Sequence, residues 1–309
     1  MKLFLNILKT SRLKQQTKNL LILVPIFLSL NYWWGESSSA ITTLLLDSII
    51  GIISFAFSSW FIYIINDFID KEKDIDHPEK SLRPIVAGEI SNKAITALSA
   101  ILLILSLILG IQLNINFFLC IISYNILMIF YCIFLKKLFL IAVLIVSGGY
   151  MLRALSGVTI ITSSPFYNSE VNIPIWLLLC TGFGALFVLL IKRLTEIKSN
   201  YLKRDVIKNY SLSRLHLLII SSELLTYFSY LFYCISSNLF PSLKANTPSD
   251  YSLLFTMPFV VFGMRYYKYL SLNNDKGDQP EVIIFKNKLL ILNFILWVSI
   301  SSLIIFYRI

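Results

Sequence analysis

The stretch NDFIDKEKDIDHPEKSLRPIVAG, from Asn66 to Gly88, follows a long apolar run and gathers charge in a chain that otherwise avoids it. On a helix, Asn66, Asp70 and Asp74 recur every four residues. Asp67 lies three residues before Asp70, so the pattern predicts one helix face with three carboxylates and an amide. Carboxylates held that closely repel one another unless a cation lies among them or water surrounds them. The spacing therefore predicts a cation site at the end of a helix.

All four side chains offer oxygen ligands, which suit Mg²⁺, a cation that keeps several waters and shares its other positions with substrate phosphates. We therefore expect Mg²⁺, with Mn²⁺ as an alternative, and the predicted metal ligands are Asn66, Asp67, Asp70 and Asp74. Pro78 is expected to stop the helix and to push His77 out of helical geometry. The loop that follows, closed by Gly88, offers Lys80 and Arg83 as contacts for phosphate.

Composition places this stretch in a membrane protein. The chain has 309 residues, of which 57% are hydrophobic and 14% charged, with a mean hydropathy of +0.75. This is too apolar for a soluble domain, and long apolar runs between short polar stretches indicate helical spans rather than barrel strands. We expect an all-α integral membrane protein with one transmembrane catalytic domain over residues 1–309. The first apolar run lacks a small-residue cleavage site, so a first span is expected rather than a removed signal peptide.

Nine membrane spans are predicted, each near the length of about 20 residues that a bilayer needs. They cover residues 19–35, 41–65, 94–113, 115–134, 138–162, 174–192, 215–238, 251–271 and 289–307. With a cytoplasmic N-terminus, 24 of the 27 Lys and Arg residues fall on the cytoplasmic side, as the positive-inside rule requires. The net charge of +10 then needs no nucleic acid to explain it, and the basic face suits anionic lipids or phosphorylated substrates.

By the same topology, two polar loops lie on the cytoplasmic face. One is Asn66–Gly88, and the other is KRLTEIKSNYLKRDVIKNYSLSR, which starts at Lys192. We expect them to form two walls of one cytoplasmic cavity. Within the second loop, Lys192 and Glu196 are spaced i, i+4, so a simple helix brace is an alternative to a site.

One charged residue lies inside a predicted span. Arg153 is rare in that position, because a guanidinium in a membrane usually faces a bundle interior or an aqueous cavity. A functional or gating role is expected, and Asp47 or Glu223 could be its ion-pair partner.

Several segments together resemble the UbiA superfamily of intramembrane prenyltransferases. The pattern Asn66-Asp67-x-x-Asp70-x-x-x-Asp74 resembles the first aspartate-rich motif of that superfamily. The whole chain is similar to its polyprenyl-phosphate phosphoribosyltransferase branch. The segments that carry this resemblance are RLKQQTKN at Arg12–Asn19, DHPEKSLRPIVAG at Asp76–Gly88, GYMLRALSG at Gly149–Gly157, KRLTE at Lys192–Glu196, TMPFVVFGMRYYKYL at Thr256–Leu270 and GDQPE at Gly277–Glu281.

Three departures accompany the resemblance. Apolar residues around Ala142 stand where the branch has an aspartate, and FKNK at Phe285–Lys288 replaces a Leu-x-Asp-Arg-like segment. The third departure is from the superfamily's ordinary aromatic prenyltransferases, because Lys192, Arg193 and Glu196 occupy the place of their second aspartate motif. This last feature favours the phosphoribosyl branch.

The resemblance implies a nine-helix fold and the transfer of 5-phosphoribosyl from phosphoribosyl diphosphate to a polyprenyl phosphate. It implies a cell inner membrane location, with the site at the cytoplasmic face. Asp67, Asp70 and Asp74 are the candidate catalytic residues, which would hold Mg²⁺ against the donor's diphosphate. The implied substrate-binding residues are Asn66, Lys80, Arg83, Lys192, Arg193, Glu196 and Arg153, together with Lys18, Lys136 and Lys137 for the lipid phosphate.

Three alternatives stay open at this point. An aromatic prenyltransferase would use the same metal site with a prenyl diphosphate donor. A transporter of a phosphorylated solute would also place charges in a cavity near the midplane, and a membrane scaffold would tolerate the loss of Asp70 and Asp74.

Overall fold

The computed structural model describes residues 2–164, 175–198, 212–239, 251–273 and 279–307. Every regular element in these ranges is a helix, so the prediction of an all-α chain is confirmed. The predicted loop after Glu196 falls largely on residues 199–211 and therefore lies outside the described residues, as do Gly277 and Asp278.

The N-terminal half begins with three short helical pieces between the first helix and the first long one. Its elements are α1 (Lys2–Thr10), the 3₁₀ segment η1 (Leu13–Ile22), α2 (Leu23–Leu28), α3 (Leu30–Trp33), α4 (Ser38–Ile69), α5 (Lys71–Asp74), α6 (Asn92–Leu113), α7 (Ile115–Ile133), η2 (Leu135–Lys137) and α8 (Phe139–Thr162). The C-terminal half follows with α9 (Ile175–Lys198), α11 (Leu212–Leu239), η4 (Ser252–Thr256), α12 (Met257–Asn273), α13 (Pro280–Lys286) and α14 (Lys288–Phe306).

Within the described residues, seven helices are long and apolar enough to cross a bilayer. They are α4, α6, α7, α8, α9, α11 and α14. Each coincides with one of the nine predicted spans. At 32 residues, α4 is about 48 Å long, which exceeds the hydrocarbon thickness of about 30 Å. Its length lets the polar end of α4 extend beyond the apolar layer.

The other two predicted spans fall on interrupted helices. Residues 19–35 cover the end of η1, then α2 and α3. Pro25 in α2 has no backbone N–H to bond to the preceding turn, and Ser29, between α2 and α3, leaves helical geometry with a ψ of 16°. Residues 251–271 begin with the left-handed Tyr251 and the 3₁₀ turn η4, so α12 itself has 17 residues. The number of membrane crossings and the side of the N-terminus therefore stay predictions.

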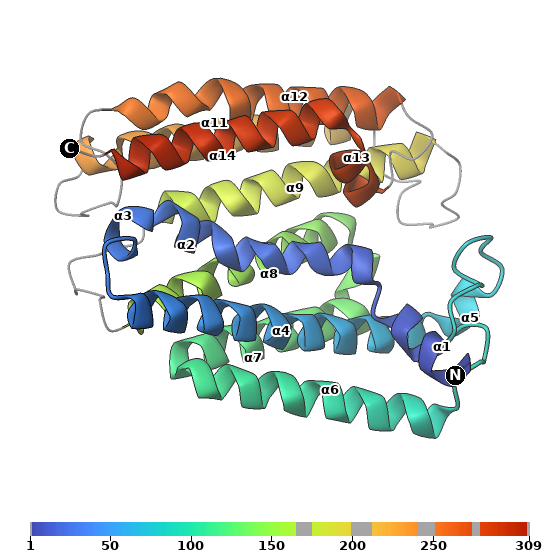
Figure 1. Cartoon of the computed structure of the whole chain (residues 1–309). Coiled ribbons are helices and arrows are strands. Elements are labelled where there is room, and N and C mark those ends of the chain that lie inside the picture. Colours follow the sequence, from blue (N-terminus) through green and yellow to red (C-terminus); the bar gives the residue numbers. More distant parts are fainter. Residues whose placement is uncertain (1, 165–174, 199–211, 240–250, 274–278, 308–309) are drawn as a thin grey trace.

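The long helices run side by side in two groups (Figure 1). One group contains η1, α2, α4, α6, α7 and α8, and the other contains α9, α11, α12 and α14, with α8 packed against α9. The elements α1, α5 and α13 all lie at the same end of this bundle. The charged stretch Asn66–Gly88 is at that end as well.

The segment η1 is held close to α8. A Cβ at Gly157 of α8 would lie 2.1 Å from the carbonyl oxygen of Ile22, so the two backbones touch where only glycine fits. A polar side chain of η1 bonds to two neighbouring helices, because Asn19 Oδ1 accepts from Ser59 of α4 and from Arg153 of α8.

Candidate functional site

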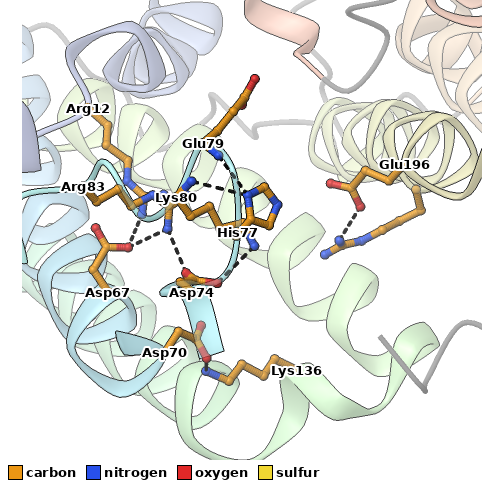
Figure 2. A network of polar contacts seen from close by, with 11 residues as sticks. Arg12, Asp67, Asp70, Asp74, His77, Glu79, Lys80, Arg83, Lys136 and Glu196 are labelled. Carbon is orange, nitrogen blue, oxygen red and sulfur yellow. Dashed lines mark hydrogen bonds and ion pairs between the residues drawn. The ribbon is translucent and has the colours of Figure 1, made fainter. Parts of the chain in front are cut away.

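The predicted aspartate helix ends earlier than expected. The helix α4 stops at Ile69, Asp70 has a non-helical ψ of 1°, and α5 is a single turn from Lys71 to Asp74. The prediction that one continuous face carries all four side chains is therefore wrong in detail. The break at Asp70 turns its carboxylate away from the other two, as Figure 2 shows.

Asp67 and Asp74 share one arginine. Arg83 Nη1 lies 2.8 Å from Asp67 Oδ1 and 3.3 Å from Asp74 Oδ2, so its guanidinium stands between two carboxylates. Arg12 also donates to Asp67 Oδ1, and Lys80 Nζ lies 3.3 Å from Asp74 Oδ1. Figure 2 shows these cations converging on the aspartates from one side. The carboxylates are thereby neutralised although both are more than nine-tenths buried.

Asp70 has a different cation. Lys136 Nζ, from η2, lies 2.6 Å from Asp70 Oδ1, and both side chains are less than a tenth exposed. The structure thus joins Lys136 to the aspartates, whereas the sequence interpretation gave it to the lipid phosphate. The neighbouring Lys137 is exposed.

The oxygen atoms of Asn66, Asp67, Asp70 and Asp74 suit Mg²⁺ in chemical type, although cations of the protein hold the three carboxylates. No three His, Cys, Asp or Glu side chains converge on a metal position within the described ranges, because each aspartate is tied to a cationic nitrogen instead. The carboxylate oxygens of the three aspartates are nevertheless the type of ligand that Mg²⁺ prefers, and these buried anions attract positive charge. Asn66 Oδ1 adds an oxygen whose described hydrogen bond is the weak one from Cys132 Sγ at 3.8 Å. The residues therefore fit the ion chemically.

The loop after α5 is held by hydrogen bonds between the His77 side chain and backbone N–H groups of the loop. His77 Nδ1 accepts hydrogen bonds from the N–H groups of Glu79 at 3.2 Å and Lys80 at 3.3 Å. Partial burial and the nearby charge of Lys80 lower the pKa of His77 below its ordinary value, which keeps Nδ1 an acceptor. Gly88 then takes a φ of 73°, which favours glycine and ends the loop as predicted. This arrangement fixes Lys80 beside Asp74.

The second predicted wall is an ion pair on α9. Arg193 Nη1 lies 2.7 Å from Glu196 Oε2, one helical turn away, and Lys192 interacts electrostatically with the same carboxylate. Arg193 also hydrogen-bonds to the hydroxyl of Tyr131, near the end of α7. The next residue, Cys132, contacts Asn66 of the first wall. The end of α7 therefore links the two predicted walls.

Arg153 is buried without a carboxylate partner among the residues that the structure describes. It donates to Asn19 Oδ1 at 2.8 Å and to the Gly149 carbonyl at 2.7 Å. Its Nη2 lies 3.0 Å from both Ser59 Oγ and Tyr124 OH. The expectation that Asp47 or Glu223 pairs with Arg153 is wrong.

Glu223 instead holds two cations of α12. Its carboxylate lies 2.7 Å from Arg265 Nε and 2.9 Å from Lys268 Nζ. Lys18, the remaining predicted residue, contacts the same ring as Arg153: Lys18 Nζ lies 5.9 Å and Arg153 Cζ 5.8 Å from the Tyr150 ring centroid.

Sequence reasoning missed two groups at this site. Arg12 stands 55 residues from Asp67, and its only signal is its place in the segment RLKQQTKN. Tyr131 and Cys132 lie inside an apolar helix, where an aromatic ring or a thiol is ordinary core material. Only the packing of α7 shows that they reach the site.

Comparisons with known proteins identify the family of the chain. The sequence profile of the UbiA prenyltransferase family matches residues 22–289. Decaprenyl-phosphate phosphoribosyltransferase of Mycolicibacterium smegmatis is 26% identical over 97% of this chain and 92% of its own length. The enzyme of that name from Mycobacterium tuberculosis is 24% identical over 95% of this chain and 92% of its own length.

Solved structures show the same fold. A UbiA homologue from Archaeoglobus fulgidus, bound to GPP and Mg²⁺, superposes with a TM-score of 0.68 at 18% identity, over 97% of this chain and 99% of the homologue. The fold, the buried aspartates and the profile match agree: the chain belongs to the UbiA prenyltransferase family and is a transferase of that superfamily.

Proposed function

We propose that this enzyme transfers 5-phosphoribosyl from phosphoribosyl diphosphate to a polyprenyl phosphate and releases diphosphate. The bond between the anomeric carbon and the diphosphate oxygen breaks, and a phosphate oxygen of the lipid forms the new bond to that carbon. Two relatives named decaprenyl-phosphate phosphoribosyltransferase, similar over nearly their full length, support this activity.

The observation that carries the proposal is the excess of cations around the aspartates. Four of them, Arg12, Lys80, Arg83 and Lys136, contact the three carboxylates, and Lys192 and Arg193 add positive charge on α9. Phosphoribosyl diphosphate carries a 5-phosphate in addition to its diphosphate, so it has more negative charge than a prenyl diphosphate. A site with this many cations suits the more highly charged donor.

The aspartates and the basic residues have separate roles in this proposal. Asp67, Asp70 and Asp74, with Asn66, would hold Mg²⁺, which when bound offsets the charge that develops on the diphosphate. Arg83 and Lys80 would move from carboxylate to phosphate, and arginine's planar fork suits two phosphate oxygens. Glu196 would accept hydrogen bonds from the ribose hydroxyls.

The acceptor needs less help from the protein. A lipid phosphate is already anionic near neutral pH, so attack on the anomeric carbon requires no general base. Lys18, beside the Tyr150 ring, would supply positive charge for it, while the polyprenyl chain would lie in an apolar groove between helices. The donor is water-soluble, which agrees with a site at the cytoplasmic face.

A donor comparison tests this function. Purified protein would receive labelled phosphoribosyl diphosphate with polyprenyl phosphates, or labelled prenyl diphosphate with an aromatic acceptor, each with Mg²⁺. We expect lipid-linked ribose phosphate from the first mixture only. Prenylated aromatic product from the second mixture, with none from the first, would replace this proposal by an aromatic prenyltransferase.

A further inference from the structure

Arg12 has a backbone conformation that is costly for its residue type. Its φ of 49° and ψ of 55° are left-handed, a region in which the Cβ of a non-glycine residue crowds the backbone. This turn between α1 and η1 brings the guanidinium to Asp67 and places it 4.9 Å from the Tyr63 ring centroid. Because such a conformation persists only where its surroundings enforce it, something must hold the turn.

A directed chain of hydrogen bonds reaches this turn from the bundle interior. Arg153 Nε donates to Asn19 Oδ1 at 2.8 Å, and Asn19 Nδ2 donates to Gln16 Oε1 at 2.8 Å. Gln16 Nε2 then donates to the Ser11 carbonyl at 2.9 Å. The Ser11 carbonyl belongs to the peptide bond that joins Ser11 to Arg12.

The direction of the chain follows from its first member. A guanidinium has only donors, so Asn19 must present its oxygen to Arg153 and its nitrogen to Gln16. Gln16 must then present its oxygen to Asn19, which leaves its nitrogen for the carbonyl of Ser11, with a longer contact of 3.5 Å to the Ala56 carbonyl. Each amide is thus held in one orientation by the residue before it.

The first member is itself firmly anchored. Arg153 is 4% exposed and also bonds to Gly149, Ser59 and Tyr124, so the described helices α4, α7 and α8 all contribute to holding it. Burying a charge beside neutral acceptors alone is expensive. The contacts from these three helices fix the guanidinium in one position.

We propose that Arg153 is a positioning residue, which acts through Asn19 and Gln16 to hold the left-handed turn that delivers Arg12 to Asp67. The chain of contacts makes the affinity of the aspartate site for diphosphate depend on a residue that does not touch Asp67. This inference rests on the proposed function only for the identity of the whole donor, because diphosphate is common to phosphoribosyl and prenyl donors.

The test is a double-mutant cycle on the full chain in detergent, with magnesium diphosphate as the probe. Gln16→Leu removes both amide contacts at similar volume, and Arg12→Leu removes the guanidinium. We expect each to raise the Kd for magnesium diphosphate about tenfold, because each removes the charge-assisted contact that the Arg12 guanidinium supplies at the site. The double variant should bind no more weakly than Arg12→Leu alone, because Gln16 acts through Arg12.

Two further variants separate positioning from general damage. Thr17→Ala changes the same segment outside the chain of contacts, since Thr17 Oγ1 bonds only locally to the Lys14 carbonyl, and it should leave the Kd unchanged. Asn19→Asp keeps the acceptor for Arg153 but loses the donor to Gln16, so it should weaken binding as Gln16→Leu does. Unfolding temperatures measured alongside show whether each variant is folded.

Two results would overturn the inference: an unchanged Kd in Gln16→Leu, or a double variant whose loss is the product of the single losses. If either result is found and the wild-type protein still transfers phosphoribosyl, the positioning role is rejected and the proposed function stands. A wild type that binds magnesium diphosphate in the expected way but transfers only prenyl groups would reject the function and keep the positioning role.

Discussion

Lys136 donates to Asp70 Oδ1 over 2.6 Å, and this buried pair joins η2 to the junction of α4 and α5. Removing one member leaves a buried charge unpaired, which costs about 3–5 kcal/mol. We expect Lys136→Met to lower the unfolding temperature clearly in the absence of Mg²⁺. Added Mg²⁺ should stabilise this variant more than the wild type, because the freed Asp70 can then bind the ion.

The matched control for that variant is the exposed neighbour Lys137→Met, measured by the same thermal unfolding in detergent with and without Mg²⁺. It should behave as the wild type does. Equal unfolding temperatures for the two variants would show that the pair with Asp70 contributes nothing.

Arg83 contacts both Asp67 and Asp74 through Nη1, and its planar guanidinium offers further N–H donors in a fixed fork that a lysine lacks. We therefore expect Arg83→Lys to lower kcat/KM for phosphoribosyl diphosphate by about 10- to 100-fold, the equivalent of one charge-assisted hydrogen bond. Steady-state kinetics in membranes measure this loss. Lys73→Ala, an exposed change in the same region, is the control. Full activity of Arg83→Lys would mean that charge alone matters there.

The pKa of His77 predicts a pH response of the loop. Burial and the charge of Lys80 lower this pKa in the folded protein, so the folded state binds fewer protons than the unfolded one. The stabilisation is present above the unfolded value of about 6.5 and is lost as pH falls through and below it. We expect faster hydrogen exchange at the amides of Glu79 and Lys80 at pH 5.5 than the intrinsic pH effect explains.

The variant His77→Asn should lose this additional pH dependence. His216→Asn, which changes the other histidine at an exposed position of α11, should keep it. An identical pH response in wild type and His77→Asn would assign the effect to another group.

Glu223 ties α11 to α12 through Arg265 and Lys268. Glu223→Gln leaves Arg265, whose side chain is 67% exposed, and Lys268 without their anion, and we expect an unfolding temperature a few degrees lower. Asp47→Asn removes a carboxylate from a long apolar helix in the same way and should have a smaller effect. A larger loss in Asp47→Asn than in Glu223→Gln would contradict the contacts described for α11 and α12.

Hydropathy predicted most of the fold, and local breaks explain the rest. Seven predicted spans coincide with helices, because burial of about 20 apolar residues leaves a chain in lipid few alternatives to a helix. The breaks near Pro25 and Tyr251 depend on local backbone geometry. Hydropathy averaged over about 20 residues does not register such local changes. The spacing of the aspartates likewise predicts a helix that continues past Asp70, whereas α4 ends at Ile69.

At the site, sequence spacing succeeded for near neighbours and failed for distant ones. Asp67, Asp74, Lys80 and Arg83 lie within 17 residues of one another, and the structure brings these four side chains together. Arg12 and Arg153 bond to residues far away in sequence. The partners of Arg153 include the amide of Asn19 and the hydroxyls of Ser59 and Tyr124, and neutral groups of this kind give no charge pattern in the sequence. The sequence offers Asp47 and Glu223 as carboxylate partners for Arg153. In the structure Glu223 pairs with Arg265 and Lys268 instead.

The most direct test of the proposed function is the transfer of label from phosphoribosyl diphosphate to polyprenyl phosphate by membranes that contain this protein. The wild type with Mg²⁺ should produce chloroform-soluble label, and a chelator or Asp70→Ala should abolish it. Absence of lipid-linked label with every polyprenyl phosphate tested, from protein that is folded in the membrane, would contradict the function; label indifferent to both chelator and Asp70→Ala would contradict the role of the aspartates.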